Sequence, residues 1–185
     1  MLTHGAGSSS EAPLLVAVAE AFAALGTAVL RCDLPFRQAS PTGPPRAGSA
    51  PRDRDGLRAA VALARRRVAR RVFLGGHSYG GRQASILAAE EPGLADALLL
   101  LSYPLHPPRR PTERRTAHFP QIRTRALFVH GTRDSFGSLD ELRDALTLIP
   151  APTRLLTIEG AGHDLGRRLA AVAATTASAF AQLSA

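Results

Sequence analysis

The chain has 185 residues, 45% of them hydrophobic, and a formal net charge of +8 at pH 7. This length suits one compact domain with a full core, so we expect a single domain over residues 1–185. The one cysteine, Cys32, excludes an internal disulfide bond, and no apolar run approaches the roughly 20 residues of a membrane-spanning helix. Because the N-terminus also lacks the pattern of a signal peptide, we expect a cytoplasmic protein that does not enter a membrane.

The positive charge comes from arginine alone, because all 23 basic residues are Arg. They cluster at positions 65–67, 70–71, 109–110 and 114–115, with few aromatic residues between them on which bases could stack. A genome-wide codon bias would explain much of this excess in a chain that is also rich in Ala, Gly, Pro and Leu. We therefore favour a solvated basic surface over a nucleic-acid site.

The first part of the chain alternates between strand and helix patterns. Residues 1–3 predict the end of a strand that runs into the glycine-rich loop 4–7, and residues 11–25 carry apolar side chains at helical spacing. Residues 27–32 predict a buried strand. The Pro-, Ser- and Gly-rich segment 35–51 predicts a mobile surface loop without a ligand motif.

The only Gly-x-Ser-x-Gly motif of the chain, residues 76–80, follows next. An amphipathic helix is expected over 52–70 and a strand over 71–75, and the motif then leads into a helix over 80–90. A sharp turn from strand to helix would hold Ser78 with its hydroxyl exposed, while the two glycines keep side chains away from the turn. Ser78 is therefore the candidate nucleophile.

The remainder of the chain continues the alternation. An unbroken apolar run within residues 95–102 is typical of a parallel strand covered on both faces. The Pro- and Arg-rich connection 103–122 shows no clear helix pattern, and its length leaves little room for a lid domain. Strand, helix, strand and helix are then expected in turn at residues 125–130, 139–149, 154–158 and 166–183.

This alternation predicts an α/β fold, with a parallel sheet covered by helices on both faces. In such sheets the chemistry lies at the C-terminal ends of the strands. Four loops at those ends carry a polar residue close to glycine, namely His4, Ser78, Asp134 and His163. We expect these loops to converge on one edge of the sheet.

A serine hydroxyl needs a base to take its proton, and that base needs a partner that orients it and stabilises its charged form. The chain supplies Asp134 and then His163 downstream of Ser78. Asp140 and Asp144 are rival carboxylates, but both lie on a predicted helix. We therefore predict that Ser78, His163 and Asp134 form the catalytic group.

Three motifs in this order resemble the α/β-hydrolase superfamily over essentially the whole chain: Gly-His-Ser-Tyr-Gly at 76–80, His-Gly-Thr-Arg-Asp at 130–134 and Gly-Ala-Gly-His at 160–163. Within it the chain resembles a small lidless branch of bacterial predicted hydrolases, a testis-expressed vertebrate homologue and a subunit of a histone-acetylating complex. The segments that carry this second likeness are residues 103–108, 115–120 and 130–137.

The resemblance implies a mechanism. Ser78 would attack an acyl carbonyl, His163 would act as general base and then general acid, and Asp134 would orient His163. The oxyanion would be held by the backbone N–H of Tyr79 and, by analogy, that of Ala6. The resemblance implies no metal and no other cofactor.

The substrate side of the site is less sharply marked. Tyr103, Leu105 and Phe119 are candidates for an acyl pocket, with packing in the core as the alternative. His106 and His118 could line the substrate site, with a structural or exposed role as the alternative. Packing or hydrogen bonding to neighbouring groups is the expected role of the other three loop histidines, His4, His77 and His130.

The resemblance also implies a minimal sheet of six parallel strands, in the order 4-3-5-6-7-8 by the family's count, without a lid. The segment 27–32 would then be an exposed edge strand, which can pair with another chain. Either the native start lies upstream of Met1 or the domain is unusually small. Homodimer formation through this edge is a hypothesis that follows.

The leading hypothesis is a serine hydrolase acting on carboxylic esters or thioesters of small, accessible acyl substrates. The short connection between Leu101 and Arg125 favours an open site. One alternative is an interaction module that kept the fold and lost turnover. A weaker alternative is binding to anionic polymers through arginine.

Overall fold

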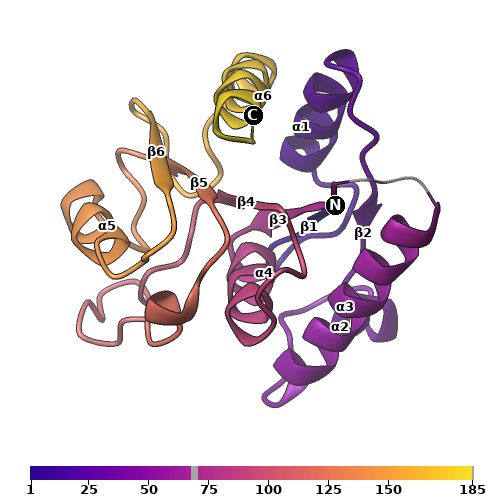
Figure 1. Cartoon of the computed structure of the whole chain (residues 1–185). Coiled ribbons are helices and arrows are strands. Elements are labelled where there is room, and N and C mark those ends of the chain that lie inside the picture. Colours follow the sequence, from indigo (N-terminus) through magenta and orange to yellow (C-terminus); the bar gives the residue numbers. More distant parts are fainter. Residues whose placement is uncertain (68–70, 185) are drawn as a thin grey trace.

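The computed structural model describes residues 1–67 and 71–184; residues 68–70, predicted as a helix end, lie outside this range. Six strands form one sheet in the order β2-β1-β3-β4-β5-β6, with every neighbouring pair parallel (Figure 1). The strands are β1 (Leu2–Thr3), β2 (Arg31–Cys32), β3 (Phe73–His77), β4 (Ala97–Leu101), β5 (Ala126–Gly131) and β6 (Thr153–Ile158). The α/β fold class and the predicted strand order are both confirmed.

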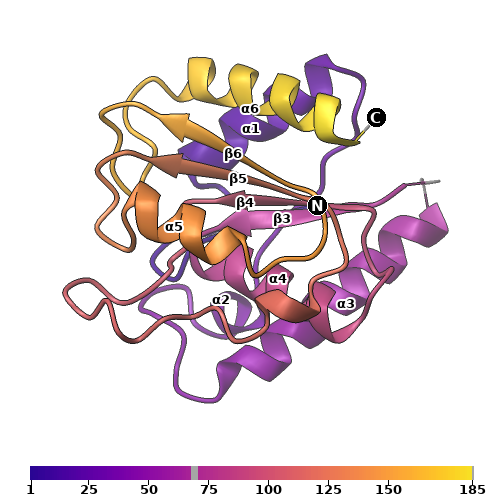
Figure 2. The same ribbon diagram turned by 60° about the vertical axis from the view of Figure 1, so that its left-hand side comes forward.

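Helices cover both faces of the sheet, as Figure 2 shows. One face carries α1 (Pro13–Ala24) and α6 (Leu169–Ser184), which pack against each other. The other carries α2 (Pro35–Ala39), α3 (Ser49–Arg67), α4 (Tyr79–Glu90), the 3₁₀ turn η1 (Phe119–Gln121) and α5 (Leu139–Leu146). None of the helices in the described part of the chain is long and apolar enough to cross a membrane.

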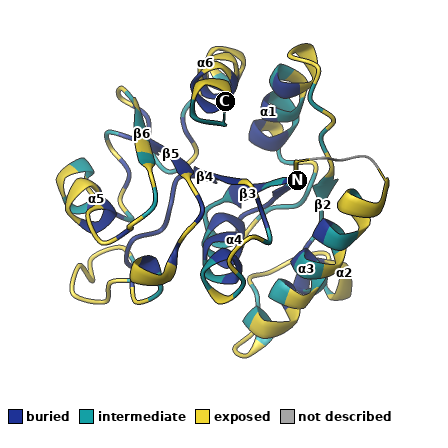
Figure 3. Ribbon diagram, in the orientation of Figure 1, coloured by how far each residue is buried: buried dark blue, intermediate teal, exposed yellow. Residues whose placement is uncertain are grey.

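Two apolar cores lie on the two faces of the sheet. In β4, Leu98 and Leu100 belong to the core under α3 and α4, whereas Leu99 and Leu101 belong to the core under α1 and α6. Successive side chains of a strand point to opposite faces, so a strand buried on both sides needs apolar residues throughout. The central strands are accordingly the most deeply buried part of the chain (Figure 3).

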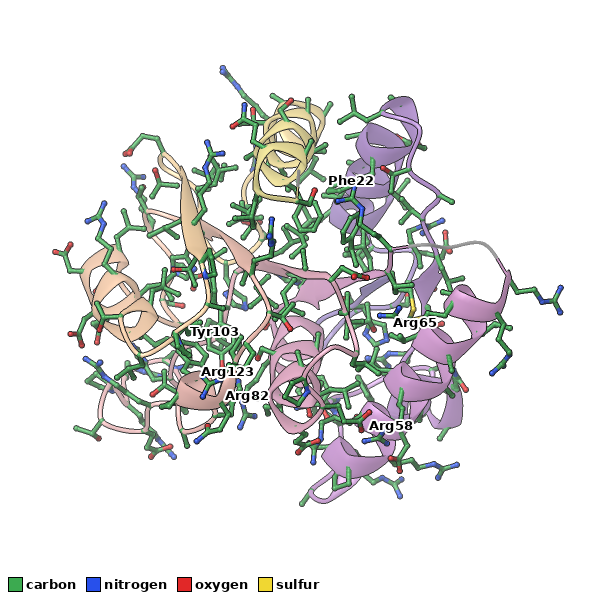
Figure 4. All side chains as sticks on the ribbon, viewed as in Figure 1. Phe22, Arg58, Arg65, Arg82, Tyr103 and Arg123 are labelled. Atoms are coloured by element: carbon green, nitrogen blue, oxygen red, sulfur yellow. The ribbon has the colours of Figure 1, made fainter. Side chains whose placement is uncertain are left out.

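Aromatic contacts connect α1, α6 and β3 in the core under α1 and α6. Phe22 of α1 meets Phe180 of α6 edge to face, with ring centroids 5.4 Å apart. Phe73 of β3 meets the same ring at 5.1 Å. In Figure 4, Phe22 lies on the side of α1 that faces α6. Such pairs add to the free energy gained by burying the rings themselves.

Some of the surface arginines form ion pairs with carboxylates. Arg58 and Arg65 of α3, both labelled in Figure 4, form ion pairs with Glu91 and Asp96. Arg114 pairs with Asp144 at 2.8 Å. Exposed pairs of this kind contribute little stability. They do fit the solvated basic surface that we favoured from the sequence.

The mobile loop predicted for residues 35–51 is wrong at both ends, because α2 and the first turn of α3 occupy them. A tertiary contact explains why this segment is helical. Phe36 is buried, and its N–H donates to the buried carboxylate of Asp53 over 2.9 Å. Proline can occupy the first turn of a helix, where its missing N–H costs nothing. Pro35 therefore starts α2 instead of marking a loop.

The edge strand is shorter than the predicted 27–32, because β2 contains only Arg31 and Cys32. The register pairs Leu2 with Arg31, which leaves residues 27–29 without a partner residue on β1. The prediction that this strand lies at the edge is correct. Pairing of this edge with a second copy stays a prediction.

Candidate active site

Ser78 lies on the tight turn between β3 and α4, in a backbone conformation that L-residues rarely adopt (φ 49°, ψ −115°). The two motif glycines are required because the backbone at the end of β1 approaches them closely. A Cβ on Gly76 would lie 2.5 Å from the carbonyl oxygen of Thr3, and one on Gly80 would lie 2.5 Å from that of His4. The turn thus packs directly against the end of β1.

Three side chains from separate loops are connected at this point. The Ser78 hydroxyl donates to Nε2 of His163 over 2.8 Å. Nδ1 of His163 lies 2.8 and 3.0 Å from the two carboxylate oxygens of Asp134. Because a carboxylate can only accept, Nδ1 carries the ring hydrogen and Nε2 is left to accept from the serine. The imidazole is therefore held in the tautomer that a general base requires.

The loops that carry these residues are held close together. Asp134 follows β5 and His163 follows β6, and the Asp134 side chain is fully buried. A Cβ on Gly131 would collide with the carbonyl oxygens of Ala161 and Gly162. The expected convergence of these loops on one edge of the sheet is confirmed.

The two rival carboxylates, those of Asp140 and Asp144, form ion pairs with arginines. Asp140 accepts from Arg143 at 2.8 Å, and Asp144 accepts from Arg114 at 2.8 Å. Both carboxylates are exposed on α5. Asp134, in contrast, also accepts the backbone N–H of Phe136 over 2.8 Å, which fixes its orientation toward the histidine.

Two rings lie beside His163: that of His77, for which packing or hydrogen bonding to a neighbouring group was expected, and that of Phe136, which was not assigned from the sequence. Phe136 stacks on the imidazole, with centroids 4.1 Å apart and planes inclined by 27°. Nε2 of His77 donates to the backbone carbonyl of His163 over 2.8 Å. Burial lowers the pKa of His77, which favours its neutral form. The motif His-Gly-Thr-Arg-Asp-Ser-Phe-Gly contained Phe136, but nothing in its spacing indicated this contact.

Two backbone N–H groups are free to point at an oxyanion. Tyr79 is the first residue of α4, and Ala6 lies in the loop after β1. Neither N–H donates to an acceptor within the described residues. The loop adjoins the serine, since a Cβ on Gly5 would lie 3.5 Å from Cβ of Ser78. The predicted oxyanion donors are therefore near the nucleophile.

The predicted substrate residues lie in the interior. Tyr103, Leu105 and Phe119 have relative exposures of 1%, 0% and 0%, and Figure 4 shows Tyr103 beneath the sheet among side chains. The Tyr103 hydroxyl donates to the carbonyl of Arg115 over 2.6 Å. His106 is also buried. This burial argues against the acyl pocket expected there and favours the alternative, packing in the core.

Neither of two cavities in the structure is lined by Ser78, Asp134 or His163. The larger, about 570 Å³, is lined mainly by apolar residues, together with Arg67 and Arg71, around the starts of β1 and β3. The smaller, about 240 Å³, lies between α2 and α3. His163 has a side-chain exposure of 22%, so the serine–histidine pair is reached from the surface. No cluster of three or more metal-ligating side chains occurs among residues 1–67 and 71–184.

Comparison with known proteins identifies the family of this chain. The sequence profile of a family described as "Alpha/beta hydrolase domain" matches residues 1–184. The chain belongs to that family. The prediction of the α/β-hydrolase superfamily is thereby confirmed.

Solved structures show the same fold. An esterase, Est1E from Butyrivibrio proteoclasticus with bound ferulic acid, superposes with a TM-score of 0.82 at 20% identity, covering 98% of this chain and 87% of that one. A dienelactone hydrolase from Anabaena variabilis gives 0.78 at 25% identity, covering 98% and 85%. A lidless serine hydrolase from Xanthomonas campestris gives 0.71 at 17% identity, covering 98% and 81%.

Proposed function

We propose that the protein is a serine hydrolase that cleaves carboxylic esters or thioesters of small acyl groups. The observation that carries this proposal is the continuous path of short contacts from the Ser78 hydroxyl through His163 to Asp134. Family membership supports hydrolase chemistry. The ester class is favoured because an esterase and a dienelactone hydrolase share the fold.

The proposed reaction proceeds in two halves. Nε2 of His163 takes the hydroxyl proton while Oγ of Ser78 bonds to the acyl carbon, and the carbonyl electrons move to oxygen. The N–H groups of Ala6 and Tyr79 stabilise that oxyanion, and each such donor is typically worth about 3 kcal/mol. The imidazolium returns its proton to the leaving alkoxide or thiolate. Water then cleaves the acyl-enzyme by the same steps.

The substrate is expected to be small and readily accessible. Tyr103 and Phe119 of the connection between β4 and β5 are buried in the interior, so these side chains do not cover Ser78. Without a lid, few contacts select the acyl chain. We therefore expect weak selectivity for chain length.

Covalent labelling and turnover test the proposal. Wild-type protein should gain the mass of a fluorophosphonate on Ser78 and should hydrolyse p-nitrophenyl acetate. Ser78→Ala should abolish labelling and lower kcat by about 10⁴-fold or more. Ser178→Ala, an exposed serine on α6, should behave as wild type. An unchanged rate in Ser78→Ala would reject the mechanism, and folded wild type without label would favour a non-catalytic module.

A further inference from the structure

A buried arginine lies behind the loop that carries Ala6. Arg37 of α2 has a relative exposure of 6%, yet sequence patterns placed it in a mobile loop. Its guanidinium donates to four backbone carbonyls. They belong to Ser8 (2.9 Å), Ala6 (3.0 Å), Gly43 (2.9 Å) and Ser40 (3.1 Å).

The charge of Arg37 has no carboxylate within 4.0 Å among the described residues. The ring of Phe36 lies 5.1 Å from the guanidinium carbon. Burying a cation is costly unless its hydrogen bonds are made, and here carbonyl dipoles alone make them. A positive charge therefore lies behind the loop of Ala6 without a direct ion-pair partner among the described residues, although the buried carboxylate of Asp53 binds the neighbouring N–H of Phe36.

The peptide group that contains the Ala6 N–H is held by its carbonyl side. The Gly5 carbonyl accepts from the ring of His4 (2.8 Å) and from the N–H of Ser8 (3.2 Å). His4 can donate because its Nε2 accepts the N–H of Leu34 over 3.1 Å, so Nδ1 carries the hydrogen. In a planar trans peptide the N–H points opposite to the C=O. The Ala6 N–H is thus directed away from the His4 ring and the Ser8 N–H.

The next peptide group is held by the arginine. Nη2 of Arg37 binds the Ala6 carbonyl and Nε binds the Ser8 carbonyl, so both carbonyls face the guanidinium. If the Ala6–Gly7 peptide rotated, its carbonyl oxygen could turn toward the oxyanion site and repel the charge that develops there. The two contacts from Arg37 oppose that rotation.

We propose that Arg37 is a positioning residue for the oxyanion hole, an inference that rests on the proposed hydrolase function. It keeps the carbonyls of the Ala6 loop turned away from Ser78, and its unpaired charge adds a favourable field for an oxyanion. Preorganised dipoles and charges of this kind stabilise the transition state more than the neutral ground state.

Arg37→Met and Arg37→Lys test the proposal, with Arg65→Met as the matched control. Arg65 also donates to two backbone carbonyls, but those of Gly93 and Leu94 precede β4, at the opposite end of the parallel strands from Ser78, which follows β3. With p-nitrophenyl acetate, Arg37→Met should lower kcat by about 10- to 100-fold with KM changed less than about threefold. Affinity for a boronic acid, which forms a tetrahedral adduct on serine, should fall by a similar factor. Arg37→Lys should lie between, and Arg65→Met should match wild type.

The outcomes separate this proposal from the one on which it rests. If wild type labels with fluorophosphonate and folded Arg37→Met keeps the wild-type kcat and boronate affinity, the Arg37 proposal is wrong and the hydrolase stands. A loss confined to KM would also overturn it. Should Arg37→Met not fold, a folded Arg37→Lys with wild-type kcat and boronate affinity would overturn it equally. A wild type without label rejects the hydrolase function itself.

Discussion

The ring of Phe136 stacks on the imidazole of His163, with centroids 4.1 Å apart, while its backbone N–H binds the Asp134 carboxylate. Phe136 thus contacts both His163, the proposed base, and Asp134, which orients it. The backbone contact would survive any side-chain substitution, which allows the effect of the ring to be measured alone.

Phe136→Leu should lower kcat by about five- to tenfold, because an aromatic face near a cation contributes about 1 kcal/mol and the imidazole is charged in the transition state. Phe136→Tyr keeps the ring and should retain most of the activity. Steady-state kinetics on p-nitrophenyl acetate measure both. Equal rates for the leucine and tyrosine variants would show that the stacking has no catalytic effect.

Asp134→Asn should lower kcat by about 10³- to 10⁴-fold, because an amide N–H in place of an acceptor oxygen favours the wrong tautomer of His163. Asp140→Asn, on the exposed face of α5, is the control and should leave the rate unchanged. The prediction fails if the two variants have similar kcat values.

Gly80→Ala should lower the free energy of unfolding by about 1–3 kcal/mol despite the better helix propensity of alanine. Its Cβ would lie 2.5 Å from the His4 carbonyl oxygen and 2.7 Å from Cγ2 of Thr3, so β1 must move. Gly7→Ala meets nothing within 4 Å and should stay within about 0.5 kcal/mol of wild type. Urea unfolding compares the two; equal midpoints would contradict the packing argument.

Acid should destabilise the protein partly through His118. Burial, followed by the charges of Arg82 and Arg54, lowers the pKa of His118 from 6.5 to about 4. Between these values the unfolded chain binds a proton at this residue and the folded chain does not, so stability falls as pH drops through this window. The contribution is at most about 3 kcal/mol.

His118→Gln removes that titration. Urea unfolding at pH 7 and pH 4.5 should therefore show a smaller acid-induced loss of stability in His118→Gln than in wild type. His4 and His77, whose pKa values are also lowered by partial or full burial of the ring, remain in both proteins. Identical losses would mean that His118 does not set the acid response.

The sequence alone was sufficient for the order of the strands and of the α-helices other than α2, because apolar periodicity and glycine or proline boundaries are local properties of the chain. It also supplied Ser78, Asp134 and His163 as candidates. Parallel strands end at the same edge of a sheet, so residues that follow them are brought together whatever the details of packing.

Only the tertiary structure decided which polar residues are buried and what they contact. Arg37 and Phe36 lie in a Pro- and Ser-rich segment with the composition of a loop, yet contacts with Asp53 and with the carbonyls of residues 6 and 8 hold it against the loop that follows β1. Tyr103 and Phe119 were equally suited to a pocket or a core. Burial depends on partners that are distant in sequence, and local patterns carry no information about those partners.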